Sequence, residues 1–197
     1  MSTLVELIDN QRTDKNTGHS YLVVYEKLFS PKKQTARNVL EIGIGWVKDE
    51  NGGSIKLWRD YFTESMIYGL DITHPDIILD SIKNDERIIL FLEKDAYDTK
   101  FFNDTFNVFM KNKLYFDILI DDGPHTLESM KTFIQMYSKL LSPTGIMVVE
   151  DVQSLDWIPQ LINAVPNHLK LYVEVYDLRY IKGRWDDILF VINCNKV

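Results

Sequence analysis

Two apolar runs that both end in acidic residues constrain the fold more than any other feature of the sequence. The first run, 116–120, leads into Asp-Asp-Gly-Pro-His at 121–125. The second run, 145–149, leads into Glu-Asp at 150–151. Short apolar runs bounded by turn residues are typical of buried strands. Because parallel sheets carry their sites at the carboxyl ends of the strands, the sequence predicts a parallel sheet with a polar site at one edge.

The acids at these strand ends define a candidate site. If the two strands are neighbours, Asp122, Glu150 and Asp151 converge with His125. Three carboxylates and an imidazole can bind a hard divalent cation and move a proton. The alternative is that the three acids are merely solvated strand ends.

The remainder of the chain alternates between strand-like and helix-like segments. Further strands are expected at 39–45, 67–71, 87–92, 169–175 and 187–193. After a helical preface, further helices are expected at 55–62, 101–110, 126–141 and 158–165. This alternation predicts a Rossmann-like, doubly wound α/β sheet of seven strands, mostly parallel and with an antiparallel edge strand.

Composition limits the classes of protein and partner. A chain of 197 residues fits a single domain, 1–197, with the helical preface at 1–37 and the sheet at 38–197. The net charge of −7 and the pI of about 5.1 argue against a nucleic-acid partner. The sequence shows no signal peptide and no apolar stretch that could span a membrane, so we expect a cytoplasmic protein without a membrane partner.

A glycine turn follows the first predicted strand. Gly43 and Gly45 allow the backbone to approach a ligand closely, as it does at nucleotide sites. Lys48 stands where the dinucleotide fingerprint GxGxxG requires its third glycine, which disfavours a nicotinamide-dependent oxidoreductase. Ser54 is the expected N-cap of the helix at 55–62.

Acids after the next two strands extend this second candidate site. Asp71 follows one strand, where an acid can accept both hydroxyls of a ribose; the alternative is a turn or cap residue. Asp95 follows the next strand, where the adenine of a nucleoside is expected. Lys15 and His19 lie in the polar segment 13–19, which either contacts a ligand or is an exposed loop.

These segments together resemble a known family. The glycine turn at 40–45, with Asp71 and Asp95, is similar to the S-adenosylmethionine site of class I methyltransferases. The motifs at 120–125 and 149–151 are more specific. They resemble those of the metal-dependent sugar O-methyltransferases of macrolide biosynthesis, of the mycinamicin type, and of the related cephalosporin-hydroxylase-like proteins.

The resemblance begins near residue 13 and implies roles for individual residues. Asp122, Glu150 and Asp151 match the family's Mg²⁺ ligands. His125 matches its general base. We expect the cofactor S-adenosylmethionine to be bound by Glu41, Gly43, Gly45, Asp71, Asp95, Asp121, Lys15 and His19.

The activity that the resemblance implies is S-adenosylmethionine- and Mg²⁺-dependent methylation of a hydroxyl on a sugar or glycosylated small molecule. Two departures limit the resemblance. The family's additional N-terminal domain has no expected counterpart in this sequence, which leaves open both the acceptor and a homo-oligomeric assembly. Pro124 replaces the family's usual small residue before His125 and stiffens that loop.

Three alternatives stand beside this interpretation. The first is a metal-dependent methyltransferase with another acceptor, such as a catechol. The second is an oxidoreductase built on a Rossmann sheet, which Lys48 disfavours. The third is a non-catalytic protein that binds S-adenosylmethionine and transfers nothing.

Two polar segments are expected to lie beside the pocket. The loops 14–19 and 177–185 should flank it and help to close it, because methyl transfer requires the exclusion of water. On the helix after the first loop, Tyr21 and Tyr25 are expected to pack against the sheet.

Overall fold

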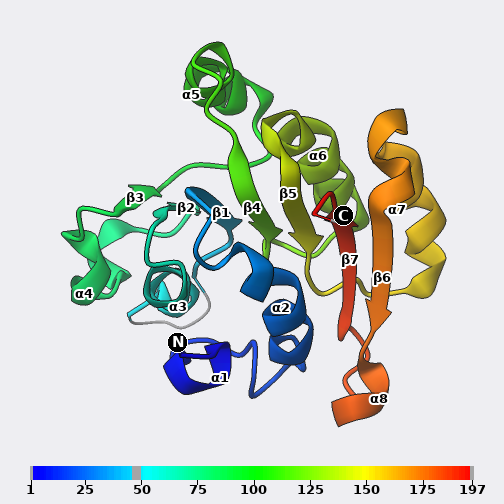
Figure 1. The fold of residues 1–197 in the computed structure, drawn as a ribbon, viewed down its shortest axis with the longest axis horizontal. Coiled ribbons are helices and arrows are strands. Elements are labelled where there is room, and N and C mark those ends of the chain that lie inside the picture. Colours follow the sequence, from blue (N-terminus) through cyan, green and yellow to red (C-terminus); the bar gives the residue numbers. More distant parts are fainter. Residues whose placement is uncertain (1, 46–49, 196–197) are drawn as a thin grey trace.

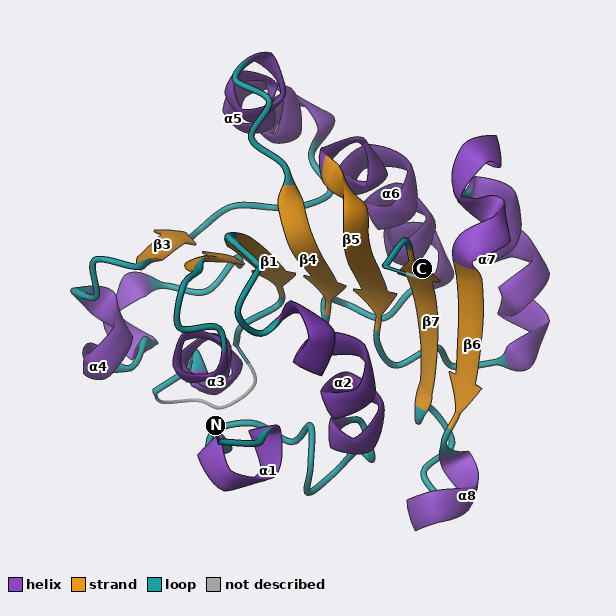
Figure 2. Ribbon diagram, viewed as in Figure 1, coloured by secondary structure: helices purple, strands orange, loops and turns teal. Residues whose placement is uncertain are grey.

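Seven strands form one twisted sheet, and helices pack on both of its faces (Figure 1, Figure 2). The computed structural model describes residues 2–45 and 50–195, so Lys48 lies outside the described residues. The strands are β1 (Asn38–Ile42), β2 (Met66–Leu70), β3 (Ile88–Phe91), β4 (Phe116–Asp121), β5 (Leu141–Val149), β6 (Val173–Asp177) and β7 (Ile188–Asn193).

The topology of the sheet is doubly wound. The strand order is β3-β2-β1-β4-β5-β7-β6, and neighbouring strands among the first five are parallel. The strand β7 is antiparallel to both β5 and β6. The predicted fold class is therefore confirmed, with one refinement. The antiparallel strand β7 lies between β5 and β6, and β6 forms the edge.

Helices within 22–61 and helices within 99–164 cover opposite faces of the sheet. The helices are α1 (Leu4–Leu7), α2 (Leu22–Phe29), α3 (Gly53–Tyr61), α4 (Asp80–Lys83), α5 (Thr99–Lys111), α6 (Leu127–Tyr137), α7 (Ile158–Ala164) and α8 (Arg179–Lys182). Ile118 and Ile120 pack with residues of α2 and α3, whereas Leu119 packs with residues of α5, α6 and α7. This division follows from the alternation of side chains along a strand. Among the residues described, no helix is long and apolar enough to cross a membrane.

The helix α6 begins directly after the acidic motif of β4. Thr126 caps it, because its hydroxyl accepts the N–H of Ser129 at 3.1 Å and the Ser129 hydroxyl accepts the N–H of Thr126 at 3.2 Å. The helix ends at Tyr137, before the predicted position 141, because a short 3-10 turn follows and β5 begins at Leu141. The cap therefore fixes the position at which the chain passes from the acidic motif into α6.

The start of α3 differs from the sequence prediction. Ser54 was expected to cap this helix, but Gly52 precedes its first residue, Gly53, and has a left-handed backbone with φ of 99°. The hydroxyl of Ser54 donates instead to a carboxylate oxygen of Glu41 at 2.5 Å. The cap prediction was wrong because a buried acid takes up the hydroxyl.

Candidate active site

The register of β1, β4 and β5 brings the predicted acids to one edge of the sheet. Ile42 pairs with Asp121, and Asp121 pairs with Val149. Asp122 and Glu150 therefore follow neighbouring strands at the same level. The N–H of Glu150 donates to the carbonyl of Asp121 at 2.9 Å, which extends the pairing of β4 and β5 into the site.

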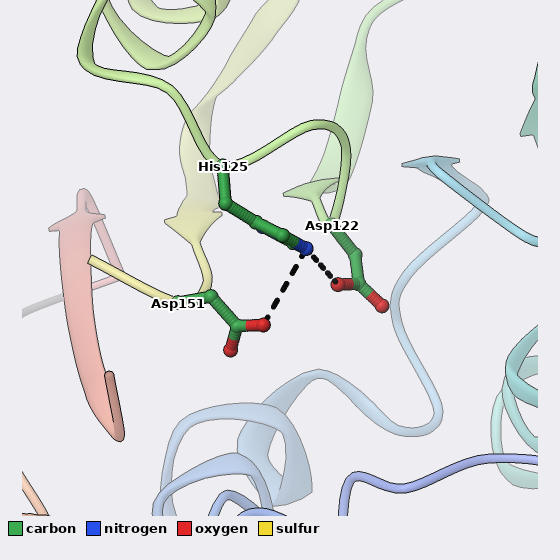
Figure 3. A group of neighbouring side chains, drawn as sticks. All are labelled: Asp122, His125 and Asp151. Atoms are coloured by element: carbon green, nitrogen blue, oxygen red, sulfur yellow. Dashed lines mark ion pairs between the residues drawn. The ribbon is translucent and has the colours of Figure 1, made fainter. Parts of the chain in front are cut away.

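Asp122, His125 and Asp151 form one group of side chains, here called the outer group (Figure 3). Nε2 of His125 lies 3.8 Å from Oδ1 of Asp122 and 3.5 Å from Oδ2 of Asp151. His125 and Asp151 both have left-handed backbones, with φ of 54° and 53°. Such conformations are uncommon for residues other than glycine and cluster at functional sites.

Burial alters the protonation of the outer group. Burial lowers the pKa of His125, an effect that outweighs the attraction of Asp122, and the ammonium of Lys15 lowers it further. Burial also raises the pKa of Asp151 to about 8, and the negative charge of Asp122 adds to this. At neutral pH the imidazole of His125 is therefore uncharged and able to accept a proton.

A second group, here called the inner group, consists of Glu41, Asp122 and Glu150. Nζ of Lys15 lies among them, 2.7 Å from both oxygens of Glu150, 2.8 Å from Oδ2 of Asp122 and 3.2 Å from Oε1 of Glu41. Lys15 is fully buried. Burial alone lowers the pKa of Lys15, but the three carboxylates outweigh it and raise this pKa well above its usual value.

Two tyrosines of the preface also bind the acids. The hydroxyl of Tyr25 donates to Glu150, and the hydroxyl of Tyr21 donates to Asp151. The ring of His19 stacks on Tyr21 with centroids 4.5 Å apart, and its Nδ1 lies 3.3 Å from Oδ1 of Asp151. Sequence reasoning assigned the tyrosines to packing alone. The sequence could have indicated these bonds, because a buried tyrosine needs a partner for its hydroxyl.

The larger cavity lies at the carboxyl ends of β1, β2 and β4 and has a volume of about 620 Å³. Its lining includes Gly43, Gly45, Asp71 and Asp95, all four predicted to bind the cofactor, together with Asp122. Gly43 has a φ of 80°, and a Cβ there would lie 1.9 Å from the carbonyl oxygen of Asp122. Only glycine fits this position, because the backbones of the two strand ends meet there.

Asp71 holds the glycine turn as well as lining the cavity. Its Oδ2 accepts the N–H groups of Ile44 and Gly45 at 2.6 and 3.0 Å. Its Oδ1 accepts the N–H of Thr73 at 2.7 Å. Each carboxylate oxygen has two lone pairs, so the side chain keeps acceptor capacity for a ligand.

The described lining of the larger cavity does not include the other four residues predicted to bind the cofactor, Glu41, Asp121, Lys15 and His19. Burial raises the pKa of Glu41 to about 7, and it raises the pKa of Asp121 likewise to about 7. Oδ1 of Asp121 accepts the hydroxyl of Tyr97 at 2.5 Å. Pairing with other polar groups of the protein therefore accounts for the positions of these four side chains.

A smaller cavity of about 310 Å³ adjoins the larger one, and Asp122 lines both. The two cavities share the lining residues Gly43, Gly45, Asp122 and Gly123. The remainder of the smaller cavity's lining is mostly charged or polar: Arg12, Thr13, Asp14, Ile44, Ser54, His125, Asp151, Arg184 and Asp186. The two cavities thus meet at the residue that belongs to both the inner and the outer groups.

The two segments expected beside the pocket are joined to each other. Asp14 from the first segment and Arg184 from the second both line the smaller cavity. Nζ of Lys182 donates to the carbonyl of His19 at 2.5 Å and to that of Asn16. The predicted flanking positions agree with the structure, whereas closure of the pocket by these segments stays a prediction.

No family model matches the sequence. Over 147 residues, 74% of this chain and 36% of the relative, it is 32% identical to the 8-demethyl-8-alpha-L-rhamnosyl tetracenomycin-C 2'-O-methyltransferase of Streptomyces olivaceus. Over 141 residues, 71% of this chain and 33% of the relative, it is 30% identical to the mycinamicin VI 2''-O-methyltransferase of Micromonospora griseorubida. The matched region thus spans about a third of the length of these curated relatives.

Solved structures with the same fold include methyltransferases. MycE, the methyltransferase from the mycinamycin biosynthetic pathway, solved in complex with Mg and SAH, matches with a TM-score of 0.65 and 24% identity, over 89% of this chain and 50% of that one. Aeropyrum pernix fibrillarin with bound S-adenosyl-L-methionine matches with a TM-score of 0.56 and 18% identity, over 82% and 67% of the two chains. The chain is therefore related in sequence to sugar O-methyltransferases and has the fold of the class I S-adenosylmethionine-dependent methyltransferases.

Proposed function

We propose that the protein is an S-adenosylmethionine- and Mg²⁺-dependent O-methyltransferase that acts on a hydroxyl of a sugar or glycosylated small molecule. One observation carries the proposal: two cavities of different character meet at Asp122. A methyl donor and an acceptor must face each other across a short gap, because positioning supplies much of the rate of a group transfer. The relatives named above are O-methyltransferases of glycosylated compounds, which agrees with this arrangement.

The larger cavity suits the methyl donor. Gly43 and Gly45 expose backbone to it, and Asp71 and Asp95 stand at its wall in the order expected for the ribose and the adenine. We assign S-adenosylmethionine to this cavity. The same four positions were predicted from the sequence to bind the cofactor.

The smaller cavity suits a polar acceptor. Its described lining contains two arginines and four carboxylates, but no tyrosine, phenylalanine or tryptophan. Sugar hydroxyls form hydrogen bonds with such groups, whereas a catechol ring favours apolar walls. The lining therefore favours the sugar acceptor over the catechol alternative.

The acids fit a divalent cation. The potential ligand atoms of Asp122, His125 and Asp151 all lie within 4.8 Å of one another, and those of Glu150 lie within the same distance of Asp122 and Glu41 in the inner group. Asp122, Glu150 and Asp151 would hold the ion through the oxygen ligands that Mg²⁺ prefers. When bound, Mg²⁺ would stabilise the negative charge that develops on the acceptor oxygen.

We assign to His125 the role of taking the proton of the acceptor. Its Nε2 faces Asp122 and Asp151 at the smaller cavity, and its lowered pKa keeps it uncharged at neutral pH. The acceptor oxygen forms a bond to the methyl carbon as the bond from that carbon to sulfur breaks. The hydroxyl proton passes to Nε2 of His125, and S-adenosylhomocysteine is the second product.

The proposal is tested by incubating the protein with S-adenosylmethionine, Mg²⁺ and matched panels of glycosides and catechols. Formation of S-adenosylhomocysteine with glycosides but not with catechols is the expected result. Binding of S-adenosylhomocysteine, followed by calorimetry, is measured in parallel. Turnover with catechols alone would mean that the acceptor is a catechol and not a sugar. Binding of S-adenosylhomocysteine without turnover on either panel would favour the non-catalytic alternative.

A further inference from the structure

The ammonium of Lys15 occupies a position between carboxylates where a metal cation could also bind. It lies within 3.2 Å of Glu41, Asp122 and Glu150, and the side chain has no exposed surface. It lines neither cavity among the described lining residues. Lys15 is therefore part of the protein's own charge balance and contributes to the wall of neither cavity.

The charges of the cluster explain why a cation is needed there. Glu41 and Glu150 are buried completely or nearly so, and Asp151 is 6% exposed. Buried carboxylates without a counter-charge are strongly destabilising, whereas a paired and hydrogen-bonded set is tolerated. Among the described residues, Lys15 is the lysine or arginine that forms ion pairs with the inner group.

The carboxylate of Asp122 is divided between the two groups. Its Oδ2 binds Lys15 at 2.8 Å, while its Oδ1 faces His125 at 3.8 Å. Both oxygens of Glu150 lie 2.7 Å from Nζ of Lys15. Any divalent ion that uses Asp122 and Glu150 must therefore share them with an ammonium that is already in place.

We propose that Lys15 is a positioning residue that acts as an internal counter-ion of the metal site. It holds Asp122 and Glu150 in place before a divalent ion binds, and it competes with that ion for the same two carboxylates. The consequence is a site that is preformed without metal and binds the ion reversibly. The proposal rests on the divalent-ion site of the proposed function.

The backbone around Lys15 is fixed independently of its ammonium. The N–H of Tyr21 donates to the carbonyl of Lys15 at 3.2 Å, and the N–H of His19 donates to that of Asp14 at 2.9 Å. Lys182 binds the same segment through the carbonyl of His19. Replacement of Lys15 by methionine, which has a similar length and no charge, should therefore keep the segment in place.

The experiment compares wild type with Lys15→Met and Lys182→Met by Mn²⁺ titration calorimetry and by thermal unfolding with and without Mn²⁺. Lys182→Met is the matched control, because it removes a lysine that ties down the same segment but does not touch the acids. Lys15→Met should bind Mn²⁺ about tenfold more tightly or better, since the competing charge is gone. Its unfolding temperature should fall without Mn²⁺ and rise more than that of wild type when Mn²⁺ is added.

A double variant keeps the proposal testable if Lys15→Met fails to fold. In Lys15→Met/Glu41→Gln one negative charge is removed with the positive one, and the amide that replaces the carboxylate can still pair with Ser54. This variant should be more stable than Lys15→Met without metal and should still bind Mn²⁺ more tightly than wild type. If it gains neither stability nor affinity, Lys15 is not a counter-ion of this cluster.

The remaining outcomes separate this proposal from the proposed function. If wild type and Lys15→Met bind Mn²⁺ equally, the counter-ion role is wrong and the metal site stands. If wild type binds no Mn²⁺ and Lys15→Met does, the counter-ion role stands and the metal-dependent function is wrong. If Lys15→Met loses S-adenosylhomocysteine and keeps its Mn²⁺ affinity unchanged, Lys15 binds the cofactor and the counter-ion role is wrong.

Discussion

The two sides of the site are built by different means. On the side of β1 and β2, the cavity is shaped by backbone: Gly43 permits a close approach, and Asp71 holds the turn through three N–H groups. On the side of β4 and β5, charged side chains come together from segments far apart, such as Lys15 and Glu150, which are 135 positions apart. The first side depends on shape and the second on charge balance, so substitutions should separate them.

The largest expected effect is on turnover alone. His125→Ala should lower the rate of methyl transfer by about 10²–10⁴-fold, which is the usual contribution of a general base. Binding of S-adenosylhomocysteine should be unchanged, because His125 does not line the larger cavity. His74→Ala serves as the control, since His74 is 58% exposed and lines neither cavity. Normal turnover of His125→Ala at neutral pH would assign the base to another group.

Gly43→Ala should damage the backbone side. The added Cβ would meet the carbonyl of Asp122, and the left-handed backbone adds strain, so the free energy of unfolding should fall by roughly 2 kcal/mol or more. Gly183→Ala is the matched control, because Gly183 is also left-handed at φ of 71° but has open space around it. It should cost only about 1–2 kcal/mol. If denaturant unfolding showed equal losses of unfolding free energy for the two variants, the close approach of Gly43 to Asp122 would not explain the effect.

Asp71→Ala should weaken S-adenosylhomocysteine binding by roughly 1–3 kcal/mol, because it removes an acceptor at the wall of the larger cavity. Mn²⁺ binding should change little, since the acids of the other side are untouched. Titration calorimetry measures both affinities on the same samples. An unchanged S-adenosylhomocysteine affinity would leave Asp71 with the role of holding the turn only.

The charged side should also show a pH-dependent stability. Burial raises the pKa of Asp121 to about 7, so the folded protein binds a proton that the unfolded chain releases above its ordinary pKa near 4. This contribution of Asp121 to stability therefore falls as the pH rises from about 4 to about 7, by about 1.4 kcal/mol for each unit of the shift. Asp121→Asn cannot release the proton, so the variant should gain stability relative to wild type over this range. If the difference in unfolding free energy between Asp121→Asn and wild type were the same at all pH values, the assignment would be contradicted.

The same contrast explains what could be predicted from the sequence. The positions of Asp122, Glu150 and Asp151 follow from local rules, because apolar runs mark strands and parallel neighbours end at the same edge. Gly43 and Asp71 follow for the same reason. These features depend on the few residues around each strand end.

The contacts made by the preface could not be predicted in this way. The position of Lys15 among the carboxylates and the bonds from Tyr21 and Tyr25 depend on how α2 docks against distant strand ends. Ser54 shows the same limit, because its hydroxyl pairs with Glu41 instead of capping its own helix. A local pattern states what a side chain can bind, whereas the tertiary structure decides which partner is near.

The central claim is that the backbone side and the charged side form one metal-dependent methyl-transfer site. It is tested most directly by measuring S-adenosylhomocysteine formation from S-adenosylmethionine and glycoside acceptors in EDTA, and again after Mg²⁺ is added in excess. The structure predicts no turnover in EDTA, recovery with Mg²⁺, and no recovery in Asp122→Asn, which removes the carboxylate shared by both groups. Methyl transfer at full rate in EDTA would contradict the claim and make the acids structural.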